Sequence, residues 1–167
     1  MKSDELRALQ APLKQRYRED PDSALITLRA RGRLGEGVVC RVETGKALVD
    51  AGLHPATGGT GLQACSGDML LEALAACAGV TLSAVATATG VPLRDAIVHV
   101  EGDLDFRGTL GVSKEAPVGF REIRLGFELD TDATEEQIAS LLNLTERYCV
   151  VYQTLRNAPP IRVRRLT

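Results

Sequence analysis

Tryptophan is absent from this chain of 167 residues, and all aromatic residues together make up only 4% of it. Proteins that hold single-stranded nucleic acid usually stack the bases on aromatic side chains, so the sequence argues against such a platform. Neither sign of charge dominates either, because 20 Lys and Arg stand against 22 Asp and Glu, a net charge of −2. This balance argues against a surface built to bind nucleic acid or an anionic membrane.

Histidine is scarce, and the cysteines lack the spacing of metal ligands. His54 and His99 are the only histidines, and neither stands at a ligand-like distance from a cysteine. The four cysteines, at 40, 65, 77 and 149, form no CxxC pair. We therefore expect no metal, and for His99, which lies in a predicted strand, a structural role. The sequence also lacks a secretory hydrophobic segment, which predicts a cytoplasmic protein with free thiols rather than a disulfide framework.

One long hydrophobic run stands out, from Ser66 to Gly90, with Asp68 and Glu72 near its start as its only charged residues. Gly90, followed by Pro92, predicts the end of a helix. Apolar residues occur on every face, which predicts a helix buried all round. Its length would also suit a membrane span, but it is rich in Ala, Thr and Ser, and no aromatic belt flanks it. We therefore expect a core helix.

The segments before this run alternate as strands do and are separated by glycine turns. We expect an antiparallel meander of three strands, at 24–33, 38–43 and 46–50. The glycine-rich loop from Gly52 to Cys65 follows, and it lacks the Lys-Ser/Thr ending of a phosphate-binding loop. An amphipathic helix over 3–18 precedes the meander. We expect residues 1–22 to form a helical extension and residues 23–167 one domain.

The segments after the central run predict two more strands, helices and a last strand. The strands are expected at 96–106 and 120–129, separated by a loop, and a final one at 161–164. Thr134 and Gln137 have the spacing of a capping box, which predicts a helix that ends near Tyr148. A further helical piece is expected over 150–156. This order of elements predicts an α+β fold in which antiparallel sheets surround one long helix.

Two thiols differ from the others by their position. Cys77 lies in the middle of the central helix, and Cys149 lies where a helix is about to restart, so its sulfur could meet free backbone N–H groups. Cys77 has no such help from its own helix, and its thiolate would need an arginine from another element. If the second helix packs over the first, the two sulfurs could be close enough to bridge. A redox pair and two packed thiols both remain open.

Two motifs resemble the signature of the OsmC/Ohr family, the osmotically inducible and organic hydroperoxide resistance proteins. They are GDMLLEALAACAGVTL, which contains Cys77, and ERYCVVYQTL, which contains Cys149. The Gly58-Gly59 loop and the segments VHVEGDLDFRG and PVGFREIRLGFEL follow in the family's order, so the resemblance covers about residues 24 to 165. The segment ALQAPLKQRYREDP resembles an extension found in one OsmC-like branch.

This resemblance implies an intertwined homodimer with two active sites at the subunit interface. It implies a thiol peroxidase of the oxidative stress response that needs neither a metal nor a bound cofactor. Cys77 matches the family's peroxidatic cysteine and Cys149 its resolving cysteine, and Arg33 is the best match for the catalytic arginine, with Arg31 and Arg41 as alternatives. An organic hydroperoxide would be the substrate, and an external dithiol such as a lipoylated protein the reductant.

The sequence departs from the family's pattern at three places. Where the best-known members have a glutamate before the helix, this chain has Cys65-Ser66-Gly67, and Asp68 is the nearest carboxylate. Val150 replaces the proline that follows the resolving cysteine. Cys65 adds a thiol that is either a buried small residue or an alternative resolving cysteine. These departures leave a second hypothesis open, a non-catalytic member of the fold that binds a small apolar or thiol ligand at the dimer interface.

Overall fold

The computed structural model describes residues 2–5, 8, 11, 19, 31–34, 39–43, 48–111 and 113–166, and among these it leaves out the side chains of 31–34, 39–43 and 48. The chain forms two compact units. One consists of residues 1–6, 73–99 and 126–167, and the other of residues 7–72 and 100–125. The helix predicted over 3–18 falls mostly outside the described residues, and the division at residue 22 stays a prediction.

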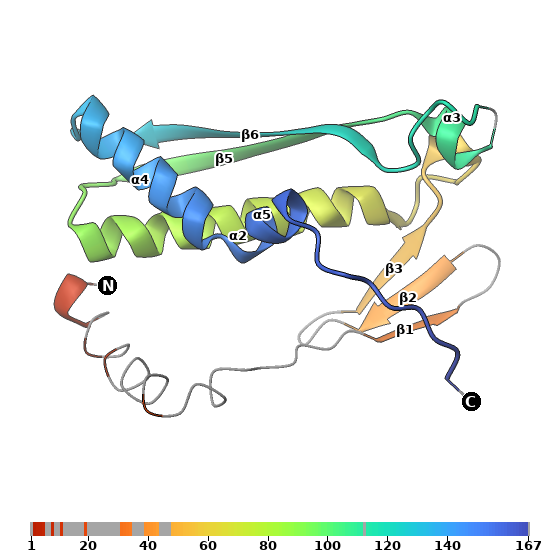
Figure 1. The fold of residues 1–167 in the computed structure, drawn as a ribbon, viewed down its shortest axis with the longest axis horizontal. Helices are drawn as coiled ribbons and strands as arrows, with labels where there is room; N and C mark the ends of the chain where they lie inside the picture. The colour runs from red at the N-terminus through yellow and green to blue at the C-terminus, as the bar shows by residue number, and fades with distance from the viewer. Residues whose placement is uncertain are drawn as a thin grey trace. The chain divides into compact units, whose positions relative to one another are not determined.

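The central helix is α2, Ser66–Thr89, drawn in yellow and green in Figure 1. It ends where the sequence predicts, because Gly90 has a φ of 74°, a left-handed conformation that costs glycine little. The N–H of Val91 then donates to the carbonyl of Ala86 at 3.1 Å. The predicted bounds of this helix are confirmed.

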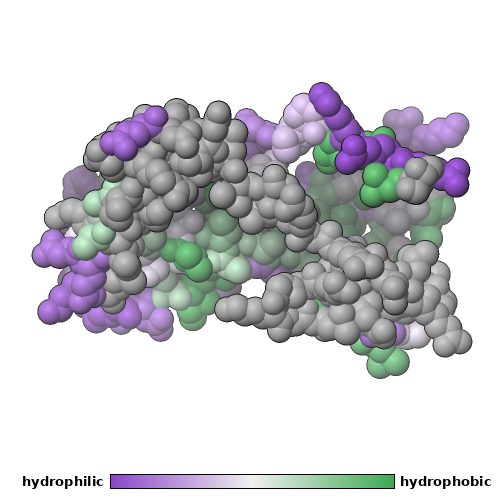
Figure 2. Space-filling view, turned by 90° about the horizontal axis from the view of Figure 1, so that it is seen from below, coloured by the Kyte–Doolittle hydropathy of each residue, from purple (hydrophilic) through white to green (hydrophobic). Residues whose placement is uncertain are grey.

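Burial of α2 within the chain is confined to one side. The buried side chains are Leu74, Ala78, Leu82, Val85 and Ala86. The opposite side carries Val80, which is 72% exposed. Figure 2 shows that hydrophobic residues also reach the surface of the molecule. The prediction of burial all round is therefore wrong for a single chain. Apolar residues on every face predicted full burial, but among the described residues of α2 the buried side chains lie on one face.

By length and composition α2 is also the one helix among the described residues that could cross a membrane. Core helices of soluble proteins share both properties. Leu82 of α2 packs in a hydrophobic core with Leu141, and half-buried Phe127 and Leu129 pack against that core. This packing is that of a helix in a protein core, as the sequence predicts.

Two helices near the C-terminus belong to the same unit as residues 73–89 of α2 and lie beside it (Figure 1). The first is α4, Glu135–Tyr148, whose capping box joins Thr134 and Gln137 as predicted. The second is α5, Val150–Arg156, and Cys149 separates the two with extended backbone angles. Leu141 of α4 is 1% exposed and anchors this helix in the core. Both predicted helices are confirmed.

A two-stranded sheet is formed by β5, Asp95–Leu104, and β6, Phe120–Asp130. Its residues alternate between half-buried and exposed, the pattern of a sheet with one wet face. On the exposed face the Arg124 guanidinium pairs with Glu101 and Asp103 on the neighbouring strand. Both predicted strands are confirmed. A short helix, α3, Phe106–Thr109, occupies the start of the predicted loop between them.

The other unit contains the predicted meander. Its strands are β1, Arg31–Leu34, β2, Val39–Glu43, and β3, Leu48–Gly52, paired antiparallel in that order. A short fourth strand, β4, Ala64–Cys65, runs parallel to β3. The glycine-rich loop also contains a single 3₁₀ turn, Pro55–Thr57, which the sequence did not predict.

The strand predicted at 161–164 is wrong. Residues 157–166 have no regular secondary structure, and the side chains of Ile161 and Val163 are 87% and 95% exposed. Alternating apolar and basic residues give the pattern of a strand, but a strand also needs an edge to pair with. The pattern alone did not show whether this chain offers that edge.

Gly102 allows a close approach between β5 and the start of β6. A Cβ at this position would lie 2.6 Å from two ring atoms of Phe120, well inside van der Waals contact. We expect Gly102→Ala to lower the free energy of unfolding by about 1–3 kcal/mol, the usual cost of overpacking. Urea denaturation followed by circular dichroism measures this loss.

Gly119→Ala is the matched control, because a Cβ at Gly119 would have no atom within 4 Å. We expect its unfolding midpoint to equal or slightly exceed that of the wild type, since alanine restricts the unfolded chain. Equal midpoints for the two variants would contradict the close approach at Gly102.

Candidate functional site

The structure brings two of the predicted site residues together. Cys77 lies in the middle of α2 and is half-buried, whereas Cys149 lies at the junction of α4 and α5 and is 1% exposed. The two thiols are neighbours, and each shifts the pKa of the other. Both belong to the unit built on Leu82 and Leu141, so the shared core fixes this contact.

The backbone places Cys149 by ending one helix and starting the next. Its N–H donates to the carbonyl of Thr145 at 2.9 Å, the last bond of α4, and its carbonyl accepts from the N–H of Gln153 at 3.0 Å, the first bond of α5. Its own φ and ψ, −72° and 109°, are extended. The first N–H groups of α5 have no partner within that helix, so they are available to a neighbouring anion.

Those N–H groups serve Cys77. Burial opposes ionisation of the Cys77 thiol and is the largest single influence on it, but four hydrogen bonds outweigh it and lower its pKa below the ordinary value. They come from the backbone of Val151, the Cys149 side chain, the backbone of Val150 and the side chain of Thr81. The sequence suggested that amides at this junction would help Cys149, and those of Tyr152 and Val151 do so. Those of Val151 and Val150 also reach Cys77, because the helix that carries it passes beside the junction.

Cys149 has the opposite environment. Burial raises the pKa of its thiol above the ordinary value, and hydrogen bonding and charge at Cys77 raise it further. Backbone N–H groups of Tyr152 and Val151 lower it, but less. One thiol of the pair is thus favoured as the thiolate and the other as the neutral thiol that can donate to it. This division suits a nucleophile and a resolving partner.

Side chains of α4 and α5 brace the junction. The Tyr152 hydroxyl donates to a Glu146 carboxylate oxygen at 2.8 Å, and the Gln153 amide donates to the Glu146 carbonyl at 2.8 Å. The Glu146 carboxylate also raises the pKa of Tyr152. These bonds tie α5 to the last turn of α4, which keeps the first amides of α5 directed at Cys77. This role was not predicted from the sequence, although Glu146 and Tyr152 stand on either side of Cys149.

For the predicted catalytic arginine, Arg33, the structure describes the backbone but not the side chain. The backbone of Arg33 lies in β1, opposite Arg41 in β2, and the side chains of both lie outside the described part of the chain. The same holds for Arg31. Asp68 and Glu72, the two carboxylates of α2, are exposed. The catalytic arginine therefore stays a prediction.

Cys65 does not belong to the unit that contains Cys77 and Cys149. It is the last residue of β4, in the other unit. It lines an apolar cavity of about 390 Å³ at the start of α2, together with Leu70, Leu104 and Phe120. The ring of His54 also lines this cavity and stacks on Phe106 with 4.9 Å between the ring centroids. The glycine-rich loop therefore contributes His54 and Cys65 to the wall of this cavity.

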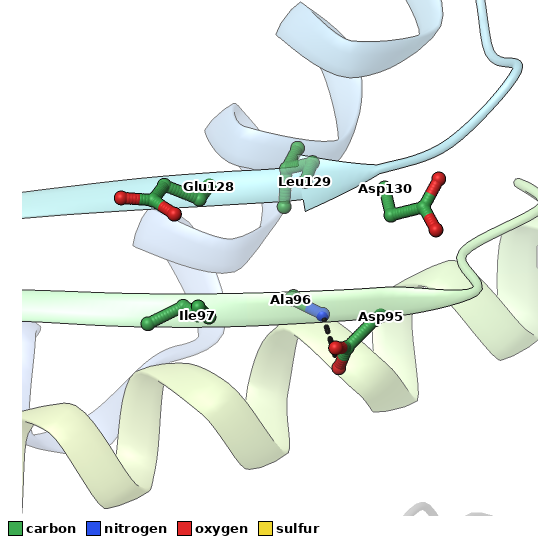
Figure 3. Close-up of a pocket in the computed structure, with 6 residues that line it drawn as sticks. All are labelled: Asp95, Ala96, Ile97, Glu128, Leu129 and Asp130. Atoms are coloured by element: carbon green, nitrogen blue, oxygen red, sulfur yellow. Dashed lines mark hydrogen bonds between the residues drawn. The ribbon is translucent and has the colours of Figure 1, made fainter.

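A smaller hollow of about 220 Å³ lies on the sheet between residues 95–97 and 128–130 (Figure 3). Three of its six lining residues are acidic, but the Asp130 carboxylate pairs with Arg94 and the Glu128 carboxylate lies 2.8 Å from Nε2 of His99. Asp95 bonds the backbone N–H of Ala96. Across the part of the chain that is described, no group of three or more His, Cys, Asp or Glu side chains could hold a metal ion.

In this α+β fold, the long helix α2 carries one thiol and the α4–α5 junction carries the other. The fold and the site together define a protein with a pair of neighbouring thiols. The family model for OsmC-like proteins matches residues 59–164, and the chain belongs to this family. That match contains both thiols of the pair. The predicted α+β, OsmC-like fold is confirmed by the solved structures described next, and the homodimer stays a prediction.

Solved structures share this fold at low identity. An OsmC-like protein from Mycoplasma pneumoniae is 19% identical with a TM-score of 0.67, covering 80% of this chain and 89% of its own. An organic hydroperoxide resistance protein from Legionella pneumophila is 19% identical with a TM-score of 0.62, at 80% and 91% coverage. Another from Elizabethkingia anophelis is 16% identical with a TM-score of 0.65, at 80% and 91% coverage. No curated protein matches the sequence.

The opposite shifts at the two thiols predict different pH profiles of alkylation. We expect the labelling rate of Cys77 by iodoacetamide to reach half of its maximum below the pH of a free cysteine, about 8.5, and that of Cys149 above it. Only the thiolate reacts, so the thiol with the lowered pKa is labelled first as the pH rises. Mass spectrometry of the two peptides over a pH series measures both rates separately.

Unfolding the reduced protein in urea provides the control, because the two midpoints should then converge on that of a free cysteine. Coincident midpoints in the folded protein, or labelling of Cys149 before Cys77, would contradict the arrangement.

Proposed function

We propose that this protein is a thiol peroxidase that reduces organic hydroperoxides to alcohols, with Cys77 as the peroxidatic and Cys149 as the resolving cysteine. The observation that supports it is the contact of the two sulfurs, in surroundings that lower the pKa of one thiol and raise that of the other. The organic hydroperoxide resistance proteins of Legionella pneumophila and Elizabethkingia anophelis share the fold.

The reaction proceeds in three steps that use no metal and no bound cofactor. The Cys77 thiolate attacks the terminal oxygen of ROOH, the O–O bond breaks, and the leaving alkoxide takes a proton to give ROH and a Cys77 sulfenic acid. The Cys149 sulfur then attacks the Cys77 sulfur, and hydroxide leaves and takes the thiol proton, forming a disulfide and one water. An external dithiol, for which a lipoylated protein is the candidate, reduces the disulfide and is itself oxidised.

Two further assignments belong to this proposal. Arg33 supplies a guanidinium that stabilises the Cys77 thiolate and the developing alkoxide, with Arg31 and Arg41 as alternatives for this role. The protein works in the cytoplasm, where thiol reductants keep such a pair reduced between turnovers.

The active form is a homodimer joined along the exposed side of α2. Ala73, Ala76, Val80 and Ser83 are exposed on this helix and follow one another at intervals of three, four and three residues. This is the spacing of a seam between two packed helices, and the small side chains allow a close approach. The pattern supports a second copy of α2 as the partner of this side.

A second candidate function is ligand binding without catalysis. Two features favour it. The stretch Cys65-Ser66-Gly67 lacks the glutamate of the best-known members, and the cavity beside Cys65, lined by Leu70, Leu104 and Phe120, suits a small apolar ligand. It predicts a protein whose thiols do not respond to peroxide.

One equivalent of cumene hydroperoxide should convert the reduced protein to a form two daltons lighter, with the peptides of Cys77 and Cys149 joined. Cys77→Ser should abolish peroxide consumption with a dithiol, because it removes the sulfur that attacks the peroxide in the proposed first step. Cys149→Ser should leave a sulfenic acid that dimedone traps.

Arg33→Ala should lower the rate by about tenfold or more, the usual range for loss of a transition-state donor. Mass spectrometry and a peroxide assay measure these outcomes.

Cys65→Ser is the matched control and should retain turnover, since Cys65 takes no part in the proposed steps. A reduced protein that leaves both cumene and tert-butyl hydroperoxide intact would overturn the peroxidase and leave the ligand-binding hypothesis.

The proposed dimer makes a separate prediction. Val80→Glu places a charge on the seam of α2, and we expect it to convert the dimer to a monomer, because an unpaired charge is costly to bury. Size-exclusion chromatography with light scattering measures the mass. Ile97→Glu is the control, since Ile97 is 52% exposed on the wet face of the β5–β6 sheet, and should remain dimeric. A wild-type protein of monomeric mass would contradict the dimer itself.

A further inference from the structure

Charge is distributed unevenly along this chain, although its sum is small. Residues 147–166 contain no Asp or Glu but have arginines at positions 147, 156, 162, 164 and 165. All of these arginines are exposed, and none of them pairs with a carboxylate among the residues that the structure describes. The carboxylate that precedes them, that of Glu146, is half-buried and accepts the Tyr152 hydroxyl. The surface of this stretch is therefore positive, and it attracts anionic groups.

A hollow of about 470 Å³ lies at the start of this stretch. Its lining comes from the last turn of α4, from α5 and from the residues after α5, and it includes Arg147, Tyr148, Val150, Gln153 and Pro159. The Arg147 guanidinium lies over the Tyr148 ring, 5.5 Å from the ring centroid. A guanidinium held by its flat face keeps the N–H groups at its edge for a carboxylate. The hollow thus combines a cation with apolar walls.

The hollow borders the proposed resolving cysteine. Tyr148 and Val150 precede and follow Cys149, so their Cα atoms each lie about 3.8 Å from that of Cys149. Tyr148 and Val150 are 58% and 71% exposed, whereas Cys149 is buried. A molecule that fills the hollow therefore lies next to the disulfide that the proposed reaction forms. The species that has to approach this disulfide in each turnover is the external dithiol.

We propose that the hollow and the arginines of residues 147–166 form a docking surface for the protein that reduces the Cys77–Cys149 disulfide, and that this partner presents its dithiol beside acidic side chains. We call it the arginine surface. The inference rests on the proposed function, and it adds the chemical class of the reductant and the place where it binds. Carboxylates pair with guanidinium groups through two parallel hydrogen bonds, which fix orientation as well as affinity.

The reduction needs only the two thiols of this partner. A thiolate of the partner attacks the disulfide and bonds to one of its sulfurs, and the other sulfur leaves as a thiolate and takes the proton that the partner's thiol lost. The partner's second thiol then attacks the partner's own sulfur in this mixed disulfide. The second protein sulfur leaves and takes a proton, so the protein regains two thiols and the partner holds the disulfide.

The side chains among the arginines favour a protein as the partner. Tyr148, Val150 and Leu155 are exposed here, and interfaces between proteins are enriched in Tyr and Arg around an apolar centre. A membrane surface is usually bound by a long amphipathic helix, but α5 has 7 residues and the described residues after it have no regular secondary structure. Single-stranded nucleic acid is usually held on stacked aromatic rings, of which Tyr148 would be the only exposed one in residues 147–166.

Charged dithiol peptides test the arginine surface. Diamide forms the disulfide, and the probes are a synthetic peptide whose two cysteines are flanked by glutamates and the same peptide with lysines instead. Each rate is divided by the rate of that peptide with hydroxyethyl disulfide, which corrects for the reactivity of its thiols. At about 20 mM salt we expect the glutamate peptide to be faster by about tenfold or more, the lower end of electrostatic steering. At about 1 M salt the two rates should converge, because screening then acts within about 3 Å.

Arg147→Gln should lower the low-salt preference for the glutamate peptide about threefold, and adding Arg156→Gln and Arg162→Gln should remove most of it. Arg94→Gln is the matched control, because it removes the same charge from the same unit. Arg94 pairs with Asp130, before the start of α4, whereas Arg147 lies in its last turn, and the 14 residues of this helix span about 20 Å. The control should keep the preference of the wild type.

The disulfide formed by diamide needs no peroxide, so the test separates this inference from the proposed function. A preference that Arg147→Gln lowers, in a protein that never consumes cumene hydroperoxide, would support the arginine surface and overturn the peroxidase. Equal corrected rates for the two peptides, in a protein that consumes peroxide, would overturn the arginine surface alone. If diamide forms no disulfide, fluorescence anisotropy of a labelled glutamate peptide with serines for cysteines decides, and absence of binding at low salt overturns the surface.

Other occupants give different results. A triple glutamine variant that loses the mass of a dimer in light scattering would assign these arginines to the contact between two copies of this chain and overturn the proposal. Tighter binding of the wild type to phosphatidylglycerol vesicles or to duplex DNA than to the glutamate peptide, lost in the same variant, would also overturn it.

Discussion

The contact between the sulfurs of Cys77 and Cys149 is the interaction on which the rest of this site depends. It requires that α2 pass beside the α4–α5 junction, and the core around Leu82 and Leu141 provides that crossing. Burial alone would keep both thiols neutral. The interaction between the two thiols breaks this symmetry, because it lowers the pKa of Cys77 and raises that of Cys149, while amides at the start of α5 lower both. A packing arrangement thereby becomes an electrostatic difference between two otherwise similar side chains.

The junction at Cys149 has two separate tasks. Its extended backbone ends α4 and frees the first N–H groups of α5, which a continuous helix would have used internally. The bonds from Tyr152 and Gln153 to Glu146 then fix the direction in which those groups point. Val150, which stands where the family has a proline, has an N–H that proline would lack, and this N–H bonds the Cys77 sulfur. The departure from the family's pattern therefore adds a donor.

Local signals predicted local structure well. The capping box at Thr134, the stop at Gly90 and the alternation in the two long strands each depend on neighbouring residues, and the structure has each element within a few positions. The errors concern partners. The strand expected near Ile161 needs an edge, and full burial of α2 needs a second cover, and neither requirement is written in a local pattern. The donors at Cys77 were missed for the same reason, since Val150 is far from Cys77 in sequence.

The stretch Cys65-Ser66-Gly67, which stands where the best-known members have a glutamate, can be weighed in these terms. A glutamate that pairs with the catalytic arginine acts on the thiolate indirectly, by fixing the direction of a guanidinium. Backbone amides fixed by helix geometry need no such support, because they cannot turn away from the sulfur. In this chain the backbone N–H groups of Val150 and Val151 lower the pKa of Cys77 from within one unit. A site that relies on these donors has less need of the glutamate, so its absence argues less strongly against activity than the sequence alone suggests.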